Sequence, residues 1–249
     1  MKVLITGSNG QLAKQIAKDC PQFIDNDFVK IFKTSKKDLD ITNNNHCQEI
    51  ISHIKPDWVI NCAAYTNVEK AEIEKDIAEK VNIIGPINLA KSIKKINGKI
   101  IHISTDYVFN GEKRKPYNTY DKKSPINFYG YTKSEGEDNV LEILNNNAFI
   151  IRTGWLYGPI GKNFLLTMLK LHNQKAKNNQ YIDVVNDQIG CPTSTYSLSS
   201  ACWQIIKKDN YLLPKILHWS DIGEISWYDF ALSIKKYAKL NNLINDFAI

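Results

Sequence analysis

The chain has 249 residues, and its composition (43% hydrophobic, 23% charged, 10% aromatic) is typical of a folded globular protein with one large domain, or one domain and a small lobe. This composition excludes collagen, a coiled coil and disorder as the main state. No apolar run approaches the roughly 20 residues that span a bilayer, so no membrane association is expected. The net charge of +6 comes from lysine, since Arg114 and Arg152 are the only arginines; this balance favours small anionic ligands such as nucleotides, and no nucleic-acid partner is expected.

Over the first 153 residues, short β-branched runs alternate with helical stretches. The predicted strands are 3–6, 28–32, 57–61, 99–104 and 148–152. The predicted helices are 11–19, 44–54, 77–95 and 125–144, the last with its start marked by Pro125. Strands separated by helices indicate βαβ units, so the predicted fold is α/β, with a Rossmann-type doubly wound parallel sheet over residues 1–153.

Beyond Trp155 the alternation becomes less regular. Helices are predicted at 163–171, 197–206 and 226–240, and a strand at 181–185. No linker divides the chain into two independent domains, so residues 154–249 are predicted to form mainly a small lobe, with some segments returning to the Rossmann domain.

The five cysteines are odd in number and form no C-x-x-C pair, which argues against a disulfide framework and a zinc site. The apolar stretch at the N-terminus is too short for the core of a signal peptide. A cytoplasmic location and no bound metal are therefore expected.

The first predicted strand leads into TGSNGQLA at residues 6–13, with the spacing G-x-x-G-x-x-A. Gly7 suits the tight turn, Gly10 lets backbone approach a pyrophosphate, and Ala13 permits close packing of helix on strand. The helix N-terminus then offers N–H groups to phosphates. The alternative is a plain glycine turn.

The end of the second predicted strand bears on the cofactor. An acid there would bind the ribose 2′-hydroxyl of NAD, but residues 32–37 offer hydroxyls and lysines, and no acid comes before Asp38. This pattern favours NADPH. NADH stays open, as does the interpretation of these lysines as solvated loop residues.

Tyr129 and Lys133 form a Y-x-x-x-K pair on one face of a predicted helix. A nearby ammonium lowers the pKa of a phenol and assists its proton exchange with a substrate oxygen. Ser104, Thr105 and Asp106 lie at the end of the fourth predicted strand, where ligands of open α/β sheets bind, and a hydroxyl there suits a substrate carbonyl. One alternative is that Thr105 is only a turn residue. Another is that Tyr131 is the reactive phenol, but only Tyr129 stands four residues before a lysine.

Two further features lie near this pattern. The stretch NCAAY at 61–65 ends the third predicted strand with small residues that let backbone pass close to a cofactor. Asn82, on the long predicted helix, either braces the catalytic helix or caps a local turn.

Longer stretches, in order across nearly the whole chain, resemble the dTDP-4-dehydrorhamnose reductase family of the extended short-chain dehydrogenase/reductase superfamily. They are ITGSNGQLA at 5–13, LDIT at 39–42, PDWVINCAAYTNVEKAE at 56–72, STDYVFNG at 104–111, SPINFYGYTKSEGE at 124–137, IRTGWLYG at 151–158, NDQIGCPT at 186–193 and ISWYDFA at 225–231. Their combination is far more specific than any single motif. Family members usually continue for several tens of residues past the last stretch, so a shortened substrate lobe is expected.

The resemblance implies that residues 1–153 are an NADP-binding Rossmann domain and that residues 154–249 are mainly a substrate-binding lobe. It also implies a role for each matching residue. Catalysis would fall to Thr105, Tyr129 and Lys133. The cofactor would be bound by Gly7, Gly10, Gln11, Leu12, Asp40, Ile41, Ala63, Ala64, Tyr65, Tyr129 and Lys133. The substrate would be contacted by Thr105, Asp106, Trp155, Gln188 and Thr193. Trp155 as a core residue and NDQIGCPT as a structural turn stay open.

The implied reaction is the NADPH-dependent reduction of the C4 keto group of dTDP-4-dehydro-L-rhamnose to dTDP-L-rhamnose, a precursor of O-antigen and other cell-surface polysaccharides. One alternative is a reductase of another nucleotide-linked 4-keto-6-deoxy sugar. Another is a catalytically silent NADP-binding homologue that regulates a partner, which the intact Thr105, Tyr129 and Lys133 set argues against. A homodimer stays open.

Overall fold

The structure, a computed structural model, describes residues 1–176, 180–208 and 213–244. It divides into two compact units. Unit 1 comprises Met1–Thr153 and Ser199–Trp219, and unit 2 comprises Gly154–Leu198 and Ser220–Ile249. Within the described ranges, no helix combines the length and the apolar character needed to cross a membrane.

Unit 1 is built on a six-stranded sheet of order β11-β7-β6-β5-β1-β4, in which every neighbouring pair is parallel. The strands are β1 (Lys2–Thr6), β4 (Lys30–Thr34), β5 (Trp58–Asn61), β6 (Lys99–Thr105), β7 (Ala148–Thr153) and β11 (Ile216–His218). Strands β5 and β7 are buried along their whole length, as expected for a parallel sheet that helices cover on both faces. The predicted α/β, Rossmann-type fold is confirmed.

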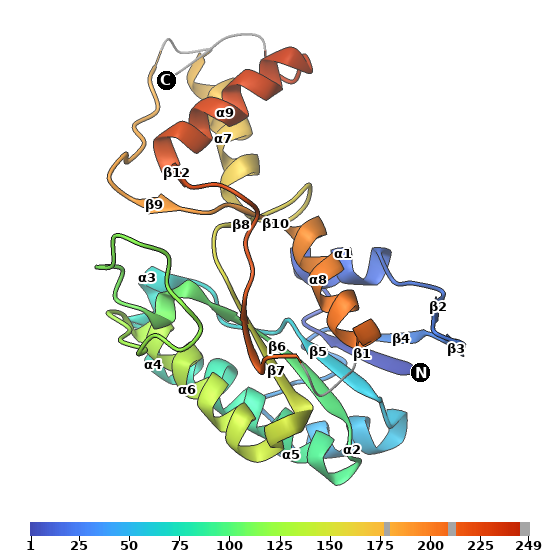
Figure 1. The fold of residues 1–249 in the computed structure, drawn as a ribbon. Helices are drawn as coiled ribbons and strands as arrows, with labels where there is room; N and C mark the ends of the chain where they lie inside the picture. The colour runs from blue at the N-terminus through green and yellow to red at the C-terminus, as the bar shows by residue number, and fades with distance from the viewer. Residues whose placement is uncertain (177–179, 209–212, 245–249) are drawn as a thin grey trace. The chain divides into compact units, whose positions relative to one another are not determined.

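Helices cover the two faces of this sheet in separate groups: Figure 1 shows α2, α5 and α6 along one face and α1 and α8 along the other. Their bounds are α1 (Gln11–Lys18), α2 (Asn44–Ile54), α5 (Gly85–Lys95), α6 (Phe128–Leu144) and α8 (Thr195–Lys208). The first group packs on a core that includes Leu89, Ile93 and Val140. In the second group, Trp203 Nε1 of α8 donates a hydrogen bond to Ile16 O of α1 at 3.0 Å.

The remaining elements of unit 1 are short. They are the hairpin β2 (Phe23–Ile24) and β3 (Asp27–Phe28), the helices α3 (Val68–Ala71) and α4 (Lys75–Glu79), the π-helical turn η1 (Lys80–Ile84), and the 3-10 turns η2 (Asp106–Val108) and η3 (Asn145–Asn147). The helix predicted over 77–95 is therefore three consecutive segments, α4, η1 and α5, with a π-helical turn in the middle.

Two further predicted elements of unit 1 start two or three residues later than predicted. Helix α6 starts at Phe128 rather than at Pro125, because Asn127 caps it: Asn127 Oδ1 accepts the Gly130 N–H at 2.7 Å. The strand predicted at 28–32 is displaced to Lys30–Thr34, since residues up to Phe28 pair in the β2–β3 hairpin.

Unit 2 contains two helices and two short strand pairs in its described part. Helices α7 (Phe164–Ala176) and α9 (Trp227–Leu240) pack around a core of Met168, Phe230, Ala231 and Ile234. Strand β8 (Leu156–Tyr157) pairs in parallel with β10 (Thr193–Ser194), and β9 (Ile189–Gly190) pairs antiparallel with β12 (Ile225–Ser226). The strand predicted at 181–185 is not formed; Val185 O accepts a single backbone contact from Tyr228 N at 3.1 Å, which is too little for a ladder.

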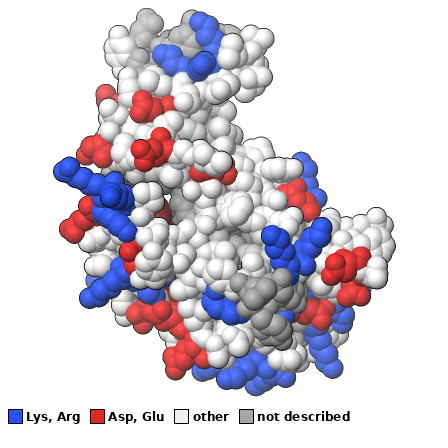
Figure 2. Space-filling view, viewed as in Figure 1, with Lys and Arg blue, Asp and Glu red and all other residues white. Residues whose placement is uncertain are grey.

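Charged side chains of both signs are interspersed over the face of the molecule shown in Figure 2, with uncharged surface between them. The net charge of +6 is small against 32 basic and 26 acidic residues. Mixed charge of this kind is typical of a solvated surface.

Candidate active site and cofactor-binding loop

The loop between β1 and α1 lies unusually close to the end of β5. Gly7 has a positive φ of 65°, and a Cβ built on it would lie 2.8 Å from the backbone nitrogen of Ala63. The Gly10 N–H donates to Gly7 O at 2.9 Å, and Gly10 is the N-cap of α1 without a side-chain capping bond. The helix therefore begins with backbone N–H groups directed at the loop, an arrangement that suits an anionic group.

Some residues around this loop are buried beneath it, and others are exposed to solvent. Leu12 and Ala13 are buried under the first turn of α1, and Gln11 is half-buried. The Ser8 N–H donates to Thr34 O at 3.0 Å, which joins the loop to the end of β4. On either side of Thr34, the side chains of Lys33, Lys36 and Lys37 are exposed.

The next predicted pair, Asp40 and Ile41, is divided between surface and core. Asp40 Oδ1 accepts hydrogen bonds from Thr42 N at 3.0 Å and Thr42 Oγ1 at 2.8 Å. The Ile41 side chain is only 5% exposed and packs in the main core, where it abuts Gly85. Its backbone oxygen accepts Asn88 Nδ2 at 3.0 Å. The Ile41 side chain therefore supports the segment of Asp40 and Ile41 from the core and is hardly exposed at the surface.

The segment of Ala63, Ala64 and Tyr65 is half-buried and is held by Asn82. Asn82 Oδ1 accepts the Tyr65 N–H at 2.8 Å, while Asn82 Nδ2 donates to Tyr65 O at 3.0 Å and to Thr132 Oγ1 at 3.1 Å. Of the two alternatives for Asn82, the brace to the helix of Tyr129 and Lys133 is therefore the one formed. The Tyr65 hydroxyl donates to Glu74 Oε2 at 2.7 Å, a hydrogen bond that raises the pKa of Tyr65 to about 12.

Tyr129 and Thr105 meet at the start of α6. Tyr129 is 8% exposed, packs edge-on against Tyr107 with ring centroids 5.6 Å apart, and shares a hydrogen bond with Thr105. Burial raises the pKa of the Tyr129 phenol above its ordinary value, although the Thr105 bond acts in the opposite direction. Thr105 Oγ1 lies 3.0 Å from Asp106 Oδ1 and accepts the Tyr107 N–H at 3.2 Å, so Thr105 also caps η2.

Lys133 lies one turn after Tyr129 on α6, and its ammonium is buried against β6. Its Nζ donates to Ile103 O at 2.7 Å and lies 3.5 Å from His102 Nε2. Burial lowers the pKa of Lys133 to about 8, although Glu137 and Cys62 favour its charged form. Unit 1 therefore brings together the predicted set of Thr105, Tyr129 and Lys133, with a buried phenol and a buried lysine on one helical face.

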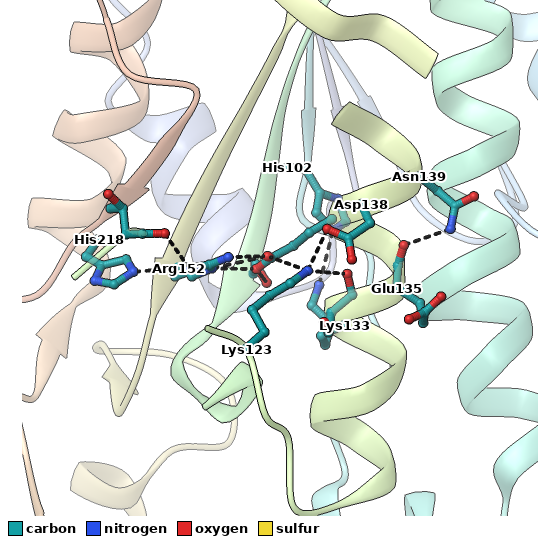
Figure 3. Close-up of polar contacts among 12 residues, drawn as sticks. His102, Lys123, Lys133, Glu135, Asp138, Asn139, Arg152 and His218 are labelled. Carbon is teal, nitrogen blue, oxygen red and sulfur yellow. Dashed lines mark hydrogen bonds and ion pairs between the residues drawn. The ribbon is translucent and has the colours of Figure 1, made fainter. Parts of the chain in front are cut away.

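A buried ion pair connects α6 to the sheet. Arg152 of β7 donates to Glu137 of α6 through Nε at 3.0 Å and through Nη2 at 2.8 Å, and the Ser104 hydroxyl donates to the same carboxylate. Figure 3 shows Arg152 between Lys123 and His218. The pair thus joins β6, β7 and α6 beside Thr105 and Lys133.

The same arginine also reaches the segment that follows η2. Arg152 Nη1 donates to Thr119 O at 3.3 Å and lies 3.5 Å from His218 Nε2, while His218 Nδ1 lies 3.1 Å from Tyr117 O. Burial lowers the pKa of His218, and the neighbouring Arg152 charge lowers it further. These contacts fix residues 117–119 to the edge of the sheet.

Sequence reasoning missed Glu137, Arg152 and His102 as parts of this site. A signal for each existed. His102 is a polar residue flanked by isoleucines in β6. Glu137 lies four residues after Lys133 on the same helical face, and Arg152 is one of two arginines and stands in a buried strand. Buried polar groups of this kind need partners, which is the reason to look for them.

The predicted substrate-side residues Trp155, Gln188 and Thr193 lie in unit 2. Trp155 has a φ of 48° and stacks on Trp227 with ring centroids 3.4 Å apart. A Cβ on Gly190 would lie 2.5 Å from Trp155 Cε2, and Thr193, fully buried, donates its N–H to Trp155 O at 3.2 Å. Gln188 is exposed just before β9. Unit 2 therefore brings Trp155 and Thr193 into direct contact and leaves Gln188 at its surface.

Across the described part of the chain, His, Cys, Asp and Glu side chains form no group of three that could hold a metal ion.

Comparison with known proteins gives a consistent result over nearly the whole chain. The family model described as RmlD substrate binding domain matches residues 1–246. The dTDP-4-dehydrorhamnose reductase of Aggregatibacter actinomycetemcomitans is 40% identical over 236 residues, which are 94% of this chain and 78% of the relative. The dTDP-4-keto-6-deoxy-D-glucose reductase of Streptomyces niveus is 36% identical over 92% of this chain and 75% of the relative. A crystal structure of the Bacillus anthracis dTDP-4-dehydrorhamnose reductase in complex with NADP is 40% identical and matches with a TM-score of 0.88, covering 100% of this chain and 83% of that one.

Proposed function

The chain belongs to the dTDP-4-dehydrorhamnose reductase family, and from that premise we propose that it reduces the C4 keto group of dTDP-4-dehydro-L-rhamnose with NADPH, giving dTDP-L-rhamnose. It is an oxidoreductase of the NAD(P)H-dependent type. The observation that carries the proposal is the buried set of Thr105, Tyr129 and Lys133 at the carboxyl end of β6 and the start of α6. A set of a phenol, an ammonium and a hydroxyl suits proton transfer to a carbonyl oxygen that is being reduced.

The residues of unit 1 fit the cofactor. The missing Cβ of Gly7 lets the loop pack against the backbone of Ala63 at the end of β5, and α1 begins at this loop with its backbone N–H end, which suits a pyrophosphate. The exposed Lys33, Lys36 and Lys37 suit a ribose 2′-phosphate. The related Bacillus anthracis enzyme was crystallised with NADP. When bound, NADPH supplies the hydride that reduces C4.

The further cofactor contacts follow the same edge of the sheet. Gly10 would border the pyrophosphate, Asp40 and Ile41 would line the adenine side, and Ala63, Ala64 and Tyr65 would border the middle of the cofactor. Asn82 supports this assignment, because its three hydrogen bonds hold the last segment against α6.

The chain's own groups divide the proton chemistry among them. Tyr129 donates its phenolic proton to the forming alkoxide oxygen, and burial keeps that phenol protonated until then because it raises the pKa of Tyr129. Thr105 donates a hydrogen bond to the developing oxyanion. Lys133 in its charged form stabilises the phenolate that remains on Tyr129.

Each unit carries residues that we assign to the sugar nucleotide. Thr105 and Asp106 would contact the sugar from unit 1. Trp155, Gln188 and Thr193 would form the substrate side in unit 2, with Trp155 fixed as a flat wall by its stacking on Trp227. In this proposal, residues 1–153 bind the cofactor and residues 154–249 mainly bind the substrate. A cytoplasmic location is part of the proposal and is supported by five cysteines that are all free.

The test is a substrate panel with purified protein, in which NADPH consumption is followed by the loss of its nicotinamide absorbance. We expect turnover with dTDP-4-dehydro-L-rhamnose and formation of dTDP-L-rhamnose, identified by its mass and its sugar NMR spectrum. Binding of NADPH without turnover of any sugar would contradict the proposal and favour a silent, regulatory homologue.

A second substrate is favoured by one specific relative. The Streptomyces niveus protein, 36% identical to this chain, is named for dTDP-4-keto-6-deoxy-D-glucose. The same panel therefore includes that sugar, and a higher kcat/KM with it than with dTDP-4-dehydro-L-rhamnose would transfer the proposal to the second substrate.

A further inference from the structure

A row of polar side chains crosses the centre of the sheet on one rung. Thr6, Asn61 and His102 are register partners on the adjacent strands β1, β5 and β6. All three are buried, and His102 has no exposed surface. Thr6 Oγ1 donates to Asn61 Oδ1 at 2.6 Å, and Asn61 Nδ2 lies 2.9 Å from His102 Nδ1. A polar row in a buried sheet is costly unless each group is paired, so its hydrogen-bond polarity can be followed atom by atom.

The polarity of this row begins at a backbone donor. The Ala63 N–H lies 3.2 Å from Asn61 Oδ1 and can only donate, so it fixes which end of the Asn61 amide is oxygen. The amide NH₂ of Asn61 therefore faces His102 Nδ1, which must accept. It follows that neutral His102 carries its proton on Nε2. Burial also keeps the imidazole uncharged, since it lowers the pKa of His102 well below the ordinary value and the nearby Lys133 charge acts in the same direction.

The Nε2–H of His102 faces the lysine of the candidate active site. Nε2 lies 3.5 Å from Lys133 Nζ, which already donates to Ile103 O. An ammonium at this position meets an N–H with an N–H, which is repulsive, whereas a neutral amine can accept that hydrogen through its lone pair. The imidazole therefore discriminates between the two charge states of Lys133.

Other groups around Lys133 bear on the same equilibrium. Glu137 and Tyr129 are on its own helix, and the Cys62 thiol approaches from the end of β5. Glu137 and Cys62 favour the ammonium, but the Glu137 carboxylate is engaged by Arg152 of β7 and by Ser104. Burial of the Lys133 side chain opposes them. His102 is the side chain of β6 that lies against Nζ.

We propose that His102, held as its Nε2–H tautomer by Asn61, is a positioning residue that disfavours the ammonium form of Lys133 and thereby sets the alkaline limb of the enzyme's pH profile. The inference rests on the proposed function, because Lys133 must be charged to stabilise the Tyr129 phenolate. As the pH rises and Lys133 loses its proton, kcat falls. If residue 102 disfavours the Lys133 ammonium less strongly, the fall of kcat moves to higher pH.

The test compares His102→Gln with the wild-type enzyme, using NADPH and dTDP-4-dehydro-L-rhamnose. A glutamine reaches the same region and can turn its amide oxygen toward Nζ, so it accepts from the ammonium. We expect the midpoint of the alkaline limb of kcat to rise by about one pH unit, with little change in KM. His53→Gln, on the exposed side of α2, is the matched control and leaves the limb in place. An unmoved limb in His102→Gln, or one moved to lower pH, overturns the inference.

A second readout needs no turnover and separates this inference from the proposed function. In the wild type, the pKa of Lys133 is about 8 when folded against an ordinary 10.5. The unfolded chain therefore binds more protons in that window, and Lys133 contributes a rise in stability as the pH increases through it. We expect a smaller rise in His102→Gln by thermal unfolding without substrate. An equal rise overturns the inference even if no sugar is turned over.

A replacement variant covers a failure of His102→Gln to fold. His102→Asn is shorter, keeps a polar group facing Asn61 and removes the N–H that faces Nζ. The same upward move of the alkaline limb, or the same smaller rise in stability, is expected. Wild-type behaviour in both measurements contradicts the proposed role of His102.

Discussion

Tyr129 is the residue on which the proposed chemistry depends most directly, because its phenol supplies the proton. Tyr129→Phe keeps the buried ring and its edge contact with Tyr107 but removes the hydroxyl. We expect kcat to fall by about 10²- to 10⁴-fold, the usual contribution of a positioned acid. NADPH affinity, measured by fluorescence titration, should be nearly unchanged. Tyr131→Phe is the matched control, since Tyr131 is the exposed phenol on the same turn of α6. Loss of activity in Tyr131→Phe with an active Tyr129→Phe would reverse the assignment.

Gly7 gives a second prediction at the residue scale, on cofactor binding. An alanine at Gly7 would adopt a left-handed conformation and bring its Cβ to within 2.8 Å of the Ala63 nitrogen. Strain of about 1–2 kcal/mol, together with displacement of the loop, should weaken NADPH binding by about tenfold or more. Gly111→Ala is the control, because Gly111 also has a positive φ but open space around it. Equal NADPH affinities in the two variants would contradict a phosphate-binding role for the Gly7 loop.

Among the elements, β6, β7 and α6 are joined by the pair of Glu137 and Arg152. Glu137→Gln leaves the buried guanidinium without its counter-charge, so the free energy of unfolding should fall by about 3–5 kcal/mol. Chemical denaturation measures this loss. Asp138→Asn is the matched control: Asp138 pairs with Lys123 but its side chain is 58% exposed, and such pairs contribute about 0–1 kcal/mol. A loss in Glu137→Gln as small as in the control would show that the buried pair is not a main support of these elements.

The elements also show how far sequence could predict this structure. Strands such as 148–152 were predictable because both faces are buried and the residues before Arg152 are all apolar. Pro125 predicts too early a start for α6, because the side chain of Asn127, two residues later, makes the capping bond. The π-helical turn has no signal in the apolar pattern, since α4 and α5 on both sides follow the helical period. Strand β11 is a three-residue edge strand, too short for a periodic pattern.

The candidate site was predictable to a similar degree. Thr105, Tyr129 and Lys133 carry a spacing that points to their chemistry, and they come together in unit 1. The partners that tune them, His102, Glu137 and Arg152, come from three different elements, and a single sequence does not show which buried polar residues will meet. Contacts between strands distant in sequence decide this part of the site.

At the scale of the whole molecule, we propose that unit 1 binds the cofactor and that unit 2 mainly binds the sugar nucleotide. Gly190→Ala tests this division, because the added Cβ would lie 2.5 Å from Trp155 Cε2 and must displace that ring from Trp227. We expect KM for the sugar nucleotide to rise by about tenfold, which corresponds to about 1.4 kcal/mol. NADPH affinity should stay at the wild-type value. A change in NADPH affinity with an unchanged KM would contradict this division of labour.

The π-helical turn at Lys80–Ile84 has a consequence for how the chain tolerates insertions and deletions. Such a turn holds one residue more than the α-helix around it, and Asn82 sits inside it, with its backbone oxygen against Gly136 and its amide on Tyr65 and Thr132. Deleting one residue there would give a regular helix but rotate Asn82 by about 100° relative to α5. The deletion would therefore reduce activity, because the extra residue of the π-helical turn directs the Asn82 amide toward Tyr65 and Thr132.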